Sequence, residues 1–166
     1  MNYEKYKHGA LDLFVYQTPK AKSPRLKKYF EAALPVFSYF MRTYSKCPAE
    51  LSMTLCGRVK IQSYNKKYRA KDKATDVLSF PLCENLRKYS EKAPFLSLGD
   101  IFICHEVARR QAKIFKLSYE DEVIHLLTHG FLHLLGFDHE LSDIEDRLMR
   151  DLEEKLIKKI SKNLKR

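Results

Sequence analysis

Three histidines within eleven residues constrain this chain more than any other part of its sequence. Positions 129–139 read HGFLHLLGFDH, and His129 and His133 are four residues apart, so on a helix both imidazoles lie on one face. Gly136 can adopt the left-handed conformation that ends a helix, after which His139 returns toward the pair. Three imidazoles without a fourth protein ligand are typical of a catalytic Zn²⁺ with water in the open position. The spacing therefore predicts one Zn²⁺ per chain at the end of a core helix.

The same spacing occurs in metzincin proteases, which carry a glutamate general base directly after the first histidine. Gly130 occupies that position here, which argues against peptide hydrolysis and leaves the general base unidentified. Imidazole ligands also suit Ni²⁺, so the metal stays open between the two ions. The structural alternative is an amphipathic helix with histidines at its polar boundary. Three histidines so close together, with a glycine at the turn, favour the metal.

The length, composition and charge of the chain limit which class of protein it can be and which partners it can bind. The chain has 166 residues, 45% of them hydrophobic, which suits one domain (1–166) with a single core. Its formal net charge of +10 favours an anionic polymer as partner. The four cysteines form no Cys-x-x-Cys pair, and neither a secretory signal nor a membrane span is evident. We therefore expect free thiols, a cytoplasmic location and no membrane partner.

Periodicity and turn signals predict about four strands and about five helices, which is an α/β or α+β domain. Ser142 and Glu145 fit a capping box that begins the last helix, whose basic part from about 153 to 166 we expect to fray after Ile160. Pro35 should bend or break the first helix. The expected strands are 11–18, 50–55, 77–81 and 98–104, the expected helices are 23–41, 58–68, 106–117, 118–135 and 142–166, and 84–96 is expected to be a loop.

Three segments of the chain resemble the YbeY family of bacterial metal-dependent endoribonucleases, which act in rRNA maturation and ribosome quality control. They are THGFLHLLGFDH (128–139), NKKYRAKDKATDVLSFP (65–81) and LGDI (98–101). The resemblance implies a mixed sheet of about four strands packed with helices, with the metal in a basic cleft. It also implies that His129, His133 and His139 bind zinc and that Arg69 acts beside the metal. The implied substrate is single-stranded rRNA at the 3′ end of the small-subunit molecule, and the implied partners are the ribosomal small subunit or its assembly factors.

Residues 60–73 form a basic segment in which lysine and arginine side chains are interleaved with tyrosine rings. By residue type alone, Arg69 would be an ordinary surface arginine. Together with the resemblance, the planar fork of arginine, which matches phosphate oxygens, makes Arg69 the candidate phosphate clamp. Tyr64 and Tyr68 suit base stacking in single-stranded RNA, and the alternative, at equal odds, is that both rings pack inward. The candidate RNA-binding residues are Lys66, Lys67, Arg69, Lys71 and Lys73.

Several acidic and histidine side chains could support the metal site. Asp138, beside a ligand histidine, could orient an imidazole or accept a proton, and it could equally cap a loop. Asp76 and Asp100 could do either, and Glu106 could reach the cleft from the start of its helix. His125 lies one turn before His129, too far along the helix to join the ligands, and is expected to support the site or pack the helix.

Three hypotheses of function follow. The leading one is a single-strand-specific, zinc-dependent endoribonuclease, with His129 and Arg69 as its catalytic residues. The second is a non-catalytic ribosome-assembly or rRNA-binding factor in which the metal serves structure, and chelation distinguishes the two. The third is a metalloprotease, which Gly130 disfavours.

Overall fold

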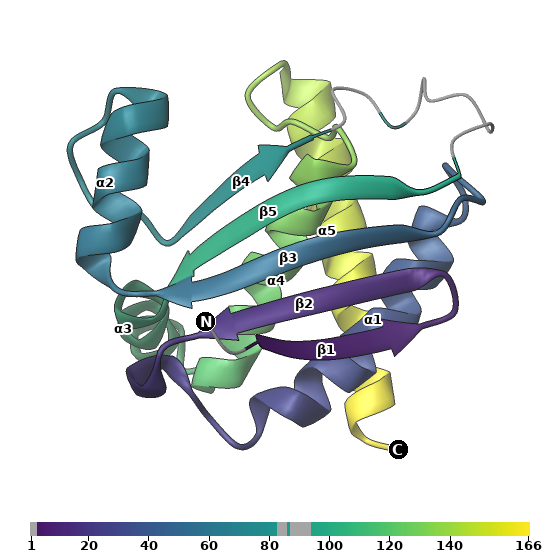
Figure 1. Ribbon diagram of the computed structural model, residues 1–166, viewed down its shortest axis with the longest axis horizontal. Coiled ribbons are helices and arrows are strands. Elements are labelled where there is room, and N and C mark those ends of the chain that lie inside the picture. The colour runs from purple at the N-terminus through teal and green to yellow at the C-terminus, as the bar shows by residue number, and fades with distance from the viewer. Residues whose placement is uncertain (1–2, 83–85, 87–93) are drawn as a thin grey trace.

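A mixed sheet of five strands lies at the centre of the protein (Figure 1). The computed structural model describes residues 3–82, 86 and 94–166. The central strands run parallel, and each edge strand runs antiparallel to its neighbour. The expected four strands were one too few. In spatial order the strands are β1 (Tyr3–His8), β2 (Leu11–Gln17), β3 (Ala49–Cys56), β5 (Leu96–Cys104) and β4 (Val77–Pro81).

The strand missing from the prediction is β1, which pairs with β2 along the edge of the sheet. Its side chains are exposed except for Tyr6, so it lacks the alternation that identifies a half-buried strand. Charged residues on an edge strand also discourage pairing with other chains. Most of the predicted loop 84–96 lies outside the described residues, and so does Cys83. Leu96, the last residue of that predicted loop, belongs to β5.

Among the described residues, five α-helices, as predicted, and the 3₁₀ turn η1 (Pro19–Ala21) accompany the sheet. The first helix begins at Leu26, later than the expected Ser23–Pro24 start, and it continues through Pro35 without a break. Ser118 caps the fourth helix in a reciprocal capping box with Asp121. The helices are α1 (Leu26–Met41), α2 (Arg58–Arg69), α3 (His105–Phe115), α4 (Tyr119–Leu134) and α5 (Asp143–Leu164).

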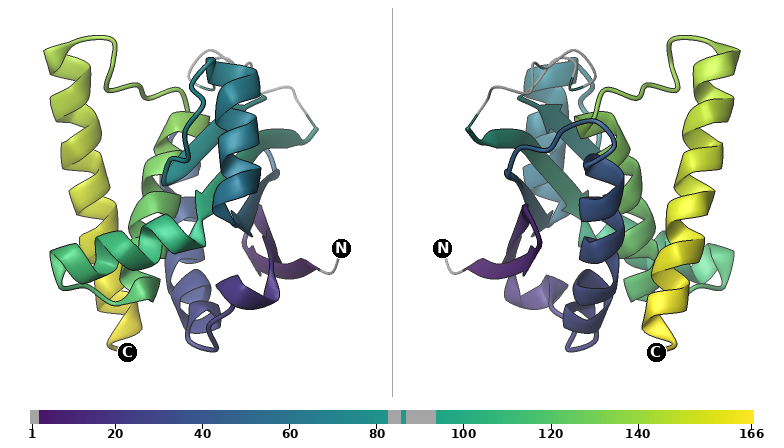
Figure 2. Two further views of the ribbon diagram at one scale, coloured as in Figure 1. Left: turned by 90° about the vertical axis from the view of Figure 1, so that its left-hand side faces the viewer. Right: turned by 90° about the vertical axis from the view of Figure 1, so that its right-hand side faces the viewer.

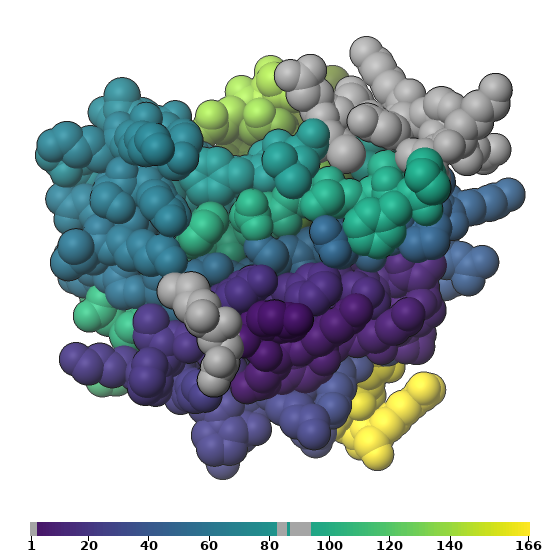
Figure 3. Space-filling view, in the orientation of Figure 1, coloured from purple at the N-terminus to yellow at the C-terminus, as the bar shows by residue number. Residues whose placement is uncertain are grey.

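Helices α1, α4 and α5 are layered on one face of the sheet. Figure 2 shows α1 and α4 next to the strands and α5 outside them. On the opposite face, which Figure 3 shows, Tyr64 and Tyr68 of α2 pack against Phe102 of β5 and Phe80 of β4, so α2 covers part of this face. Phe37 of α1 stacks on Phe131 of α4 with ring centroids 4.4 Å apart. Both rings belong to the main hydrophobic core, together with the buried side chains of β2, β3 and β5. The sheet packs against one side of α4, and α1 and α5 pack against its other sides, so these contacts fix the position of α4.

The basic C-terminal segment is an integral part of α5. Fraying after Ile160 was wrong, because Ile160 is buried and Asn163 donates a side-chain hydrogen bond of 3.0 Å to the Ala32 carbonyl of α1. The serine half of the predicted capping box is present, since the Ser142 hydroxyl accepts a hydrogen bond from the Glu145 backbone N–H at 3.2 Å. None of the described helices is long and apolar enough to span a membrane.

Candidate metal centre

Helix α4 and the loop that follows it bring the three predicted histidines together. The Nε2 atoms of His129 and His133 are 3.1 Å apart. Gly136, with φ of 92°, ends the helix, and its backbone N–H donates to the His133 carbonyl at 3.0 Å. The chain then turns so that the His139 ring lies 5.4 Å from the His129 ring and 5.3 Å from the His133 ring, between centroids.

The donor set fits a divalent transition metal. One nitrogen from each ring can be chosen so that all three lie within 4.8 Å of one another. In a tetrahedral Zn²⁺ site with Zn–N distances of about 2.0–2.1 Å, neighbouring ligand nitrogens are about 3.3 Å apart, close to the His129–His133 separation of 3.1 Å. Within residues 3–82, 86 and 94–166, no other group of three or more His, Cys, Asp or Glu side chains lies close enough together to hold a metal ion.

The environment of His133 favours its neutral form. Burial, with a further contribution from the nearby His129 and His139, lowers the pKa of His133 to about 4. A neutral imidazole keeps a lone pair on one nitrogen, which is the form that binds a metal. His133 therefore presents a ligand nitrogen at neutral pH without first having to lose a proton.

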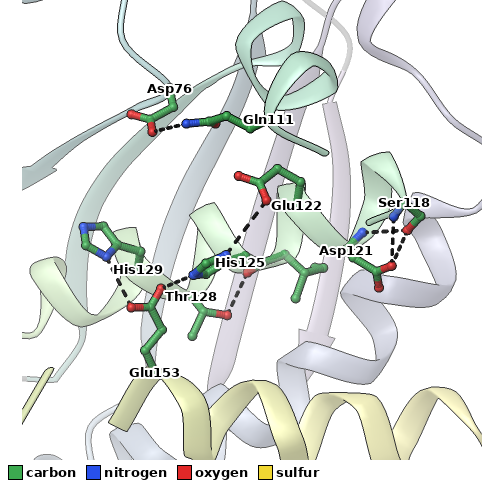
Figure 4. Close-up of polar contacts among 10 residues, drawn as sticks. Asp76, Gln111, Ser118, Asp121, Glu122, His125, Thr128, His129 and Glu153 are labelled. Atoms are coloured by element: carbon green, nitrogen blue, oxygen red, sulfur yellow. Dashed lines mark hydrogen bonds and ion pairs between the residues drawn. The ribbon is translucent and has the colours of Figure 1, made fainter. Parts of the chain in front are cut away.

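A carboxylate from α5 contacts two histidines of α4 (Figure 4). Glu153 Oε1 lies 2.9 Å from His125 Nε2, and Oε2 lies 3.6 Å from His129 Nδ1. Burial would raise the pKa of Glu153, but the contacts with His125 and His129 outweigh it and lower the pKa to about 2. The Glu153 carboxylate in turn raises the pKa of His125.

Glu153 was missed by the sequence-based reasoning. It lies in another helix, twenty-four positions after His129, so no short spacing links the two. The apolar pattern of the last helix could nevertheless have drawn attention to this residue. Glu153 follows the buried Met149 by four positions and precedes the buried Leu156 by three, which places a carboxylate on the apolar face of α5.

An open cleft of about 620 Å³ lies beside the triad. It is lined by Arg69 at the end of α2, by Lys71 just after it, and by His133 and His139. Ser79 and Pro81 of β4 and the α4–α5 loop from Gly136 to Leu141 complete its wall. The structure thus brings together the predicted arginine, one of the predicted lysines and two of the three histidines.

The other predicted RNA-binding lysines do not line this cleft. Lys66 forms an ion pair of 2.7 Å with Asp72, and the Lys67 ammonium lies 4.9 Å from the Tyr68 ring centroid. Lys73 is exposed on the loop after α2. Tyr64 packs against Phe102 with centroids 4.8 Å apart, whereas Tyr68 is 56% exposed. Inward packing therefore describes Tyr64 better than Tyr68.

The acidic candidates have structural partners. Asp138 accepts a hydrogen bond of 2.9 Å from the Glu140 backbone N–H, as a loop cap does, and its effect on the imidazoles stays a prediction. Asp76 accepts from Gln111 at 3.0 Å, and Asp100 accepts from Ser52. Glu106 does not line the cleft; it accepts a 2.7 Å hydrogen bond from the Arg58 backbone N–H and so caps α2.

Gly130 lies where α4 comes closest to the sheet. A Cβ atom at this position would stand 2.9 Å from the Ile101 Cγ2 methyl and 3.0 Å from the Ser79 hydroxyl. A glutamate could not be accommodated there without moving the helix off β5. The glycine that removes the protease base thus also permits the close packing that holds the histidine helix.

Comparison with known proteins agrees with this site. The sequence model of the family described as "Endoribonuclease YbeY" matches residues 14–161. A protein of that name from Aquifex aeolicus is 38% identical over 145 residues, which cover 87% of this chain and 88% of the relative. Another from Persephonella marina is 43% identical over 111 residues, covering 67% and 70%.

A solved structure of a Thermotoga maritima protein shares the fold. It superposes with a TM-score of 0.56 at 24% identity and covers 88% of each chain. Because the family model matches residues 14–161, which is most of the chain, the chain belongs to the endoribonuclease YbeY family.

Proposed function

We propose that this protein is a metal-dependent endoribonuclease that cleaves single-stranded RNA in the cleft beside the histidine triad. The observation that carries the proposal is the convergence of His133, His139, Arg69 and Lys71 on that one cleft. His129, His133 and His139 would hold one Zn²⁺, with Ni²⁺ as the other ion that imidazole suits. Both relatives described above bear the name endoribonuclease, which supports RNA as the substrate.

Each residue of the site then has a defined task. When bound, Zn²⁺ supplies a Lewis acid and lowers the pKa of a bound water toward about 7. The three imidazoles would hold the ion without a fourth protein ligand, because no other His, Cys, Asp or Glu joins their group among the described residues. The Arg69 guanidinium binds and orients the phosphodiester, and it stabilises the negative charge that develops on the phosphoryl oxygens. Lys71 attracts the neighbouring phosphate.

We further propose that the biological substrate is rRNA, at the 3′ end of the small-subunit molecule, and that the protein acts in the cytoplasm with the small subunit or its assembly factors. Membership of the family and the net charge of +10 support this assignment.

Cleavage of an unstructured RNA oligonucleotide by zinc-loaded protein tests the function. We expect His133→Ala to abolish cleavage and Arg69→Ala to slow it by about 10²–10³-fold. Arg110→Ala is the matched control, because Arg110 is an exposed arginine on α3 away from the cleft. Cleavage by His133→Ala at the wild-type rate would contradict the metal assignment, and an unchanged rate for Arg69→Ala would contradict the clamp. Product ends identify the nucleophile, since a 2′,3′-cyclic phosphate implies the RNA 2′-hydroxyl.

A further inference from the structure

Glu153 divides its two carboxylate oxygens between two histidines of the neighbouring helix. Oε1 faces His125 Nε2 at 2.9 Å, and Oε2 faces His129 Nδ1 at 3.6 Å, an electrostatic contact longer than a hydrogen bond. The Glu153 side chain is only 13% exposed, although it belongs to the outermost helix. Figure 4 shows the carboxylate pointing from α5 toward α4, between the two rings. A charged group held this way is expensive to bury unless its partners are charged or polar.

The two nitrogens of His129 face in different directions. Nε2 lies 3.1 Å from His133 Nε2, inside the triad, whereas Nδ1 faces the Glu153 carboxylate. A carboxylate at Nδ1 favours the tautomer that carries its hydrogen there, which leaves the lone pair on Nε2 for a metal. The same contact limits rotation of the ring about its χ2 angle. Carboxylates in this position are known to raise the basicity of ligand imidazoles.

Helix packing fixes Glu153 in place. The buried Met149 and Leu156 lie one turn before and one turn after it on the same face of α5. The other nitrogen of the His125 ring, Nδ1, lies 3.9 Å from Glu122 Oε2, and Glu122 is itself buried. The chain segment that carries His139 leads directly into α5, so docking of this helix positions both His139 and Glu153.

We propose that Glu153 is a positioning residue of the metal centre: it orients His129 through Nδ1, and His125 holds Glu153 in place. This inference rests on one part of the proposed function, which is that the histidine triad binds a metal. It requires no particular substrate. Glu153 would therefore set the affinity for the metal, and through it the activity, without touching RNA.

The test compares Glu153→Gln with Glu154→Gln. The glutamine preserves the size of the side chain but removes the charge, and Glu154 is an exposed neighbour on α5 that pairs with Lys158. Zinc affinity is measured by competition with a chromophoric chelator. We expect Glu153→Gln to weaken zinc binding by about 10–100-fold, as losses of such outer carboxylates do, and Glu154→Gln to leave it within about twofold.

A second readout separates positioning from a merely structural role. In the metal-free protein, ¹⁵N-edited NMR of the imidazoles should show the Nδ1–H tautomer of His129 in the wild type and a tautomer mixture in Glu153→Gln. A variant with lower resistance to urea but unchanged zinc affinity and tautomer would overturn the inference. If Glu153→Gln does not fold, His125→Gln replaces it, with an expected loss of affinity of at least about threefold.

The outcomes also distinguish this inference from the proposed function. A wild-type protein that binds zinc tightly, a weakened Glu153→Gln variant and no RNA cleavage by either would support the positioning role and overturn the nuclease. Equal zinc affinity of the wild type and Glu153→Gln would overturn the positioning role alone. A wild-type protein that binds no zinc would overturn both.

Discussion

At the scale of single residues, Gly130 connects the chemistry of the site to the packing of the fold. Gly130→Ala would place a methyl group 2.9 Å from the Ile101 Cγ2 atom, where the β-branched side chain cannot swing away. Overpacking costs about 1–3 kcal/mol, and the higher helix propensity of alanine returns up to about 1 kcal/mol. We therefore expect a loss of about 1–2 kcal/mol in the free energy of unfolding, measured with urea.

Gly57→Ala is the matched control for this prediction. Gly57 precedes α2 at a negative φ, and the nearest atom to an added Cβ there is Glu106 Oε2 at an ordinary 3.7 Å. Gly57 is the N-cap of α2, where alanine is poorer than glycine, but alanine also lowers the entropy of the unfolded chain. The two effects oppose each other, so the free energy of unfolding should change by less than about 1 kcal/mol. A stability of Gly130→Ala equal to or above that of the wild type would mean that α4 does not depend on close contact with β5.

Single residues also show how far the site could be predicted. The three histidines lie within eleven positions, so helix geometry and one glycine turn suffice to bring them together. Arg69 reaches the cleft across a tertiary contact, and only the family resemblance indicated it. Glu153 could not be predicted by spacing, because the angle at which α5 docks on α4 decides which histidine its carboxylate meets.

At the scale of elements, Asp76 ties the start of β4 to α3. Its carboxylate accepts hydrogen bonds from the Val77 backbone N–H at 2.8 Å, from Thr75 at 3.0 Å and from Gln111 of α3 at 3.0 Å. Burial alone would raise the pKa of Asp76, but these hydrogen bonds lower it below its usual 3.8. Asp76→Asn should lower the free energy of unfolding by about 1–3 kcal/mol at pH 7.

The sign of the pH dependence follows from the depressed pKa. The ionised Asp76 stabilises the folded state above pH 3.8, and this contribution is lost as the pH falls through the folded-state pKa. The difference between the wild type and Asp76→Asn should therefore be constant near neutrality and shrink below about pH 3.8. Asp72→Asn, which removes an exposed ion pair, is the control and should have a small effect. An undiminished difference at pH 3 would contradict the role of the ionised carboxylate.

Most elements could be predicted because their periodicity is local. The five helices and four of the strands carry clear apolar patterns, whereas β1 has one buried residue in six and is defined by its pairing with β2. At Pro35, where local rules predicted a bend or break, and after Ile160, where they predicted fraying, the helices continue. Packing of α1 against α5, including the Asn163–Ala32 hydrogen bond, outweighs both local tendencies.

At the scale of the whole molecule, the core is complete without the metal. The main hydrophobic cluster spans four of the strands and helices α1, α4 and α5, and the triad lies at its margin. Chelation should therefore leave the far-UV circular dichroism unchanged at 25 °C. It should lower Tm by about 8–16 °C relative to protein with zinc at a thousandfold excess over Kd, which adds about 4.1 kcal/mol. Unfolding on chelation at 25 °C would instead support the assembly factor with a structural metal.

The net charge of +10 makes RNA binding dependent on salt. Each phosphate contact with single-stranded RNA contributes about −0.7 to the slope of log affinity against log salt concentration. Lys71→Ala, which removes a cation that lines the cleft, should make the slope less negative by about 0.7. Lys158→Ala on α5 should leave it unchanged. Equal slopes for wild type and Lys71→Ala, measured by fluorescence anisotropy, would place the RNA elsewhere.

The central claim is that three histidines bind one metal ion and leave one position open. Diffraction at the zinc absorption edge from crystals of the zinc-loaded protein tests it most directly. We predict a single anomalous peak about 2.0–2.1 Å from one nitrogen each of His129, His133 and His139, with solvent as the fourth ligand. A peak with four protein ligands, or no peak between the three rings, would contradict the account.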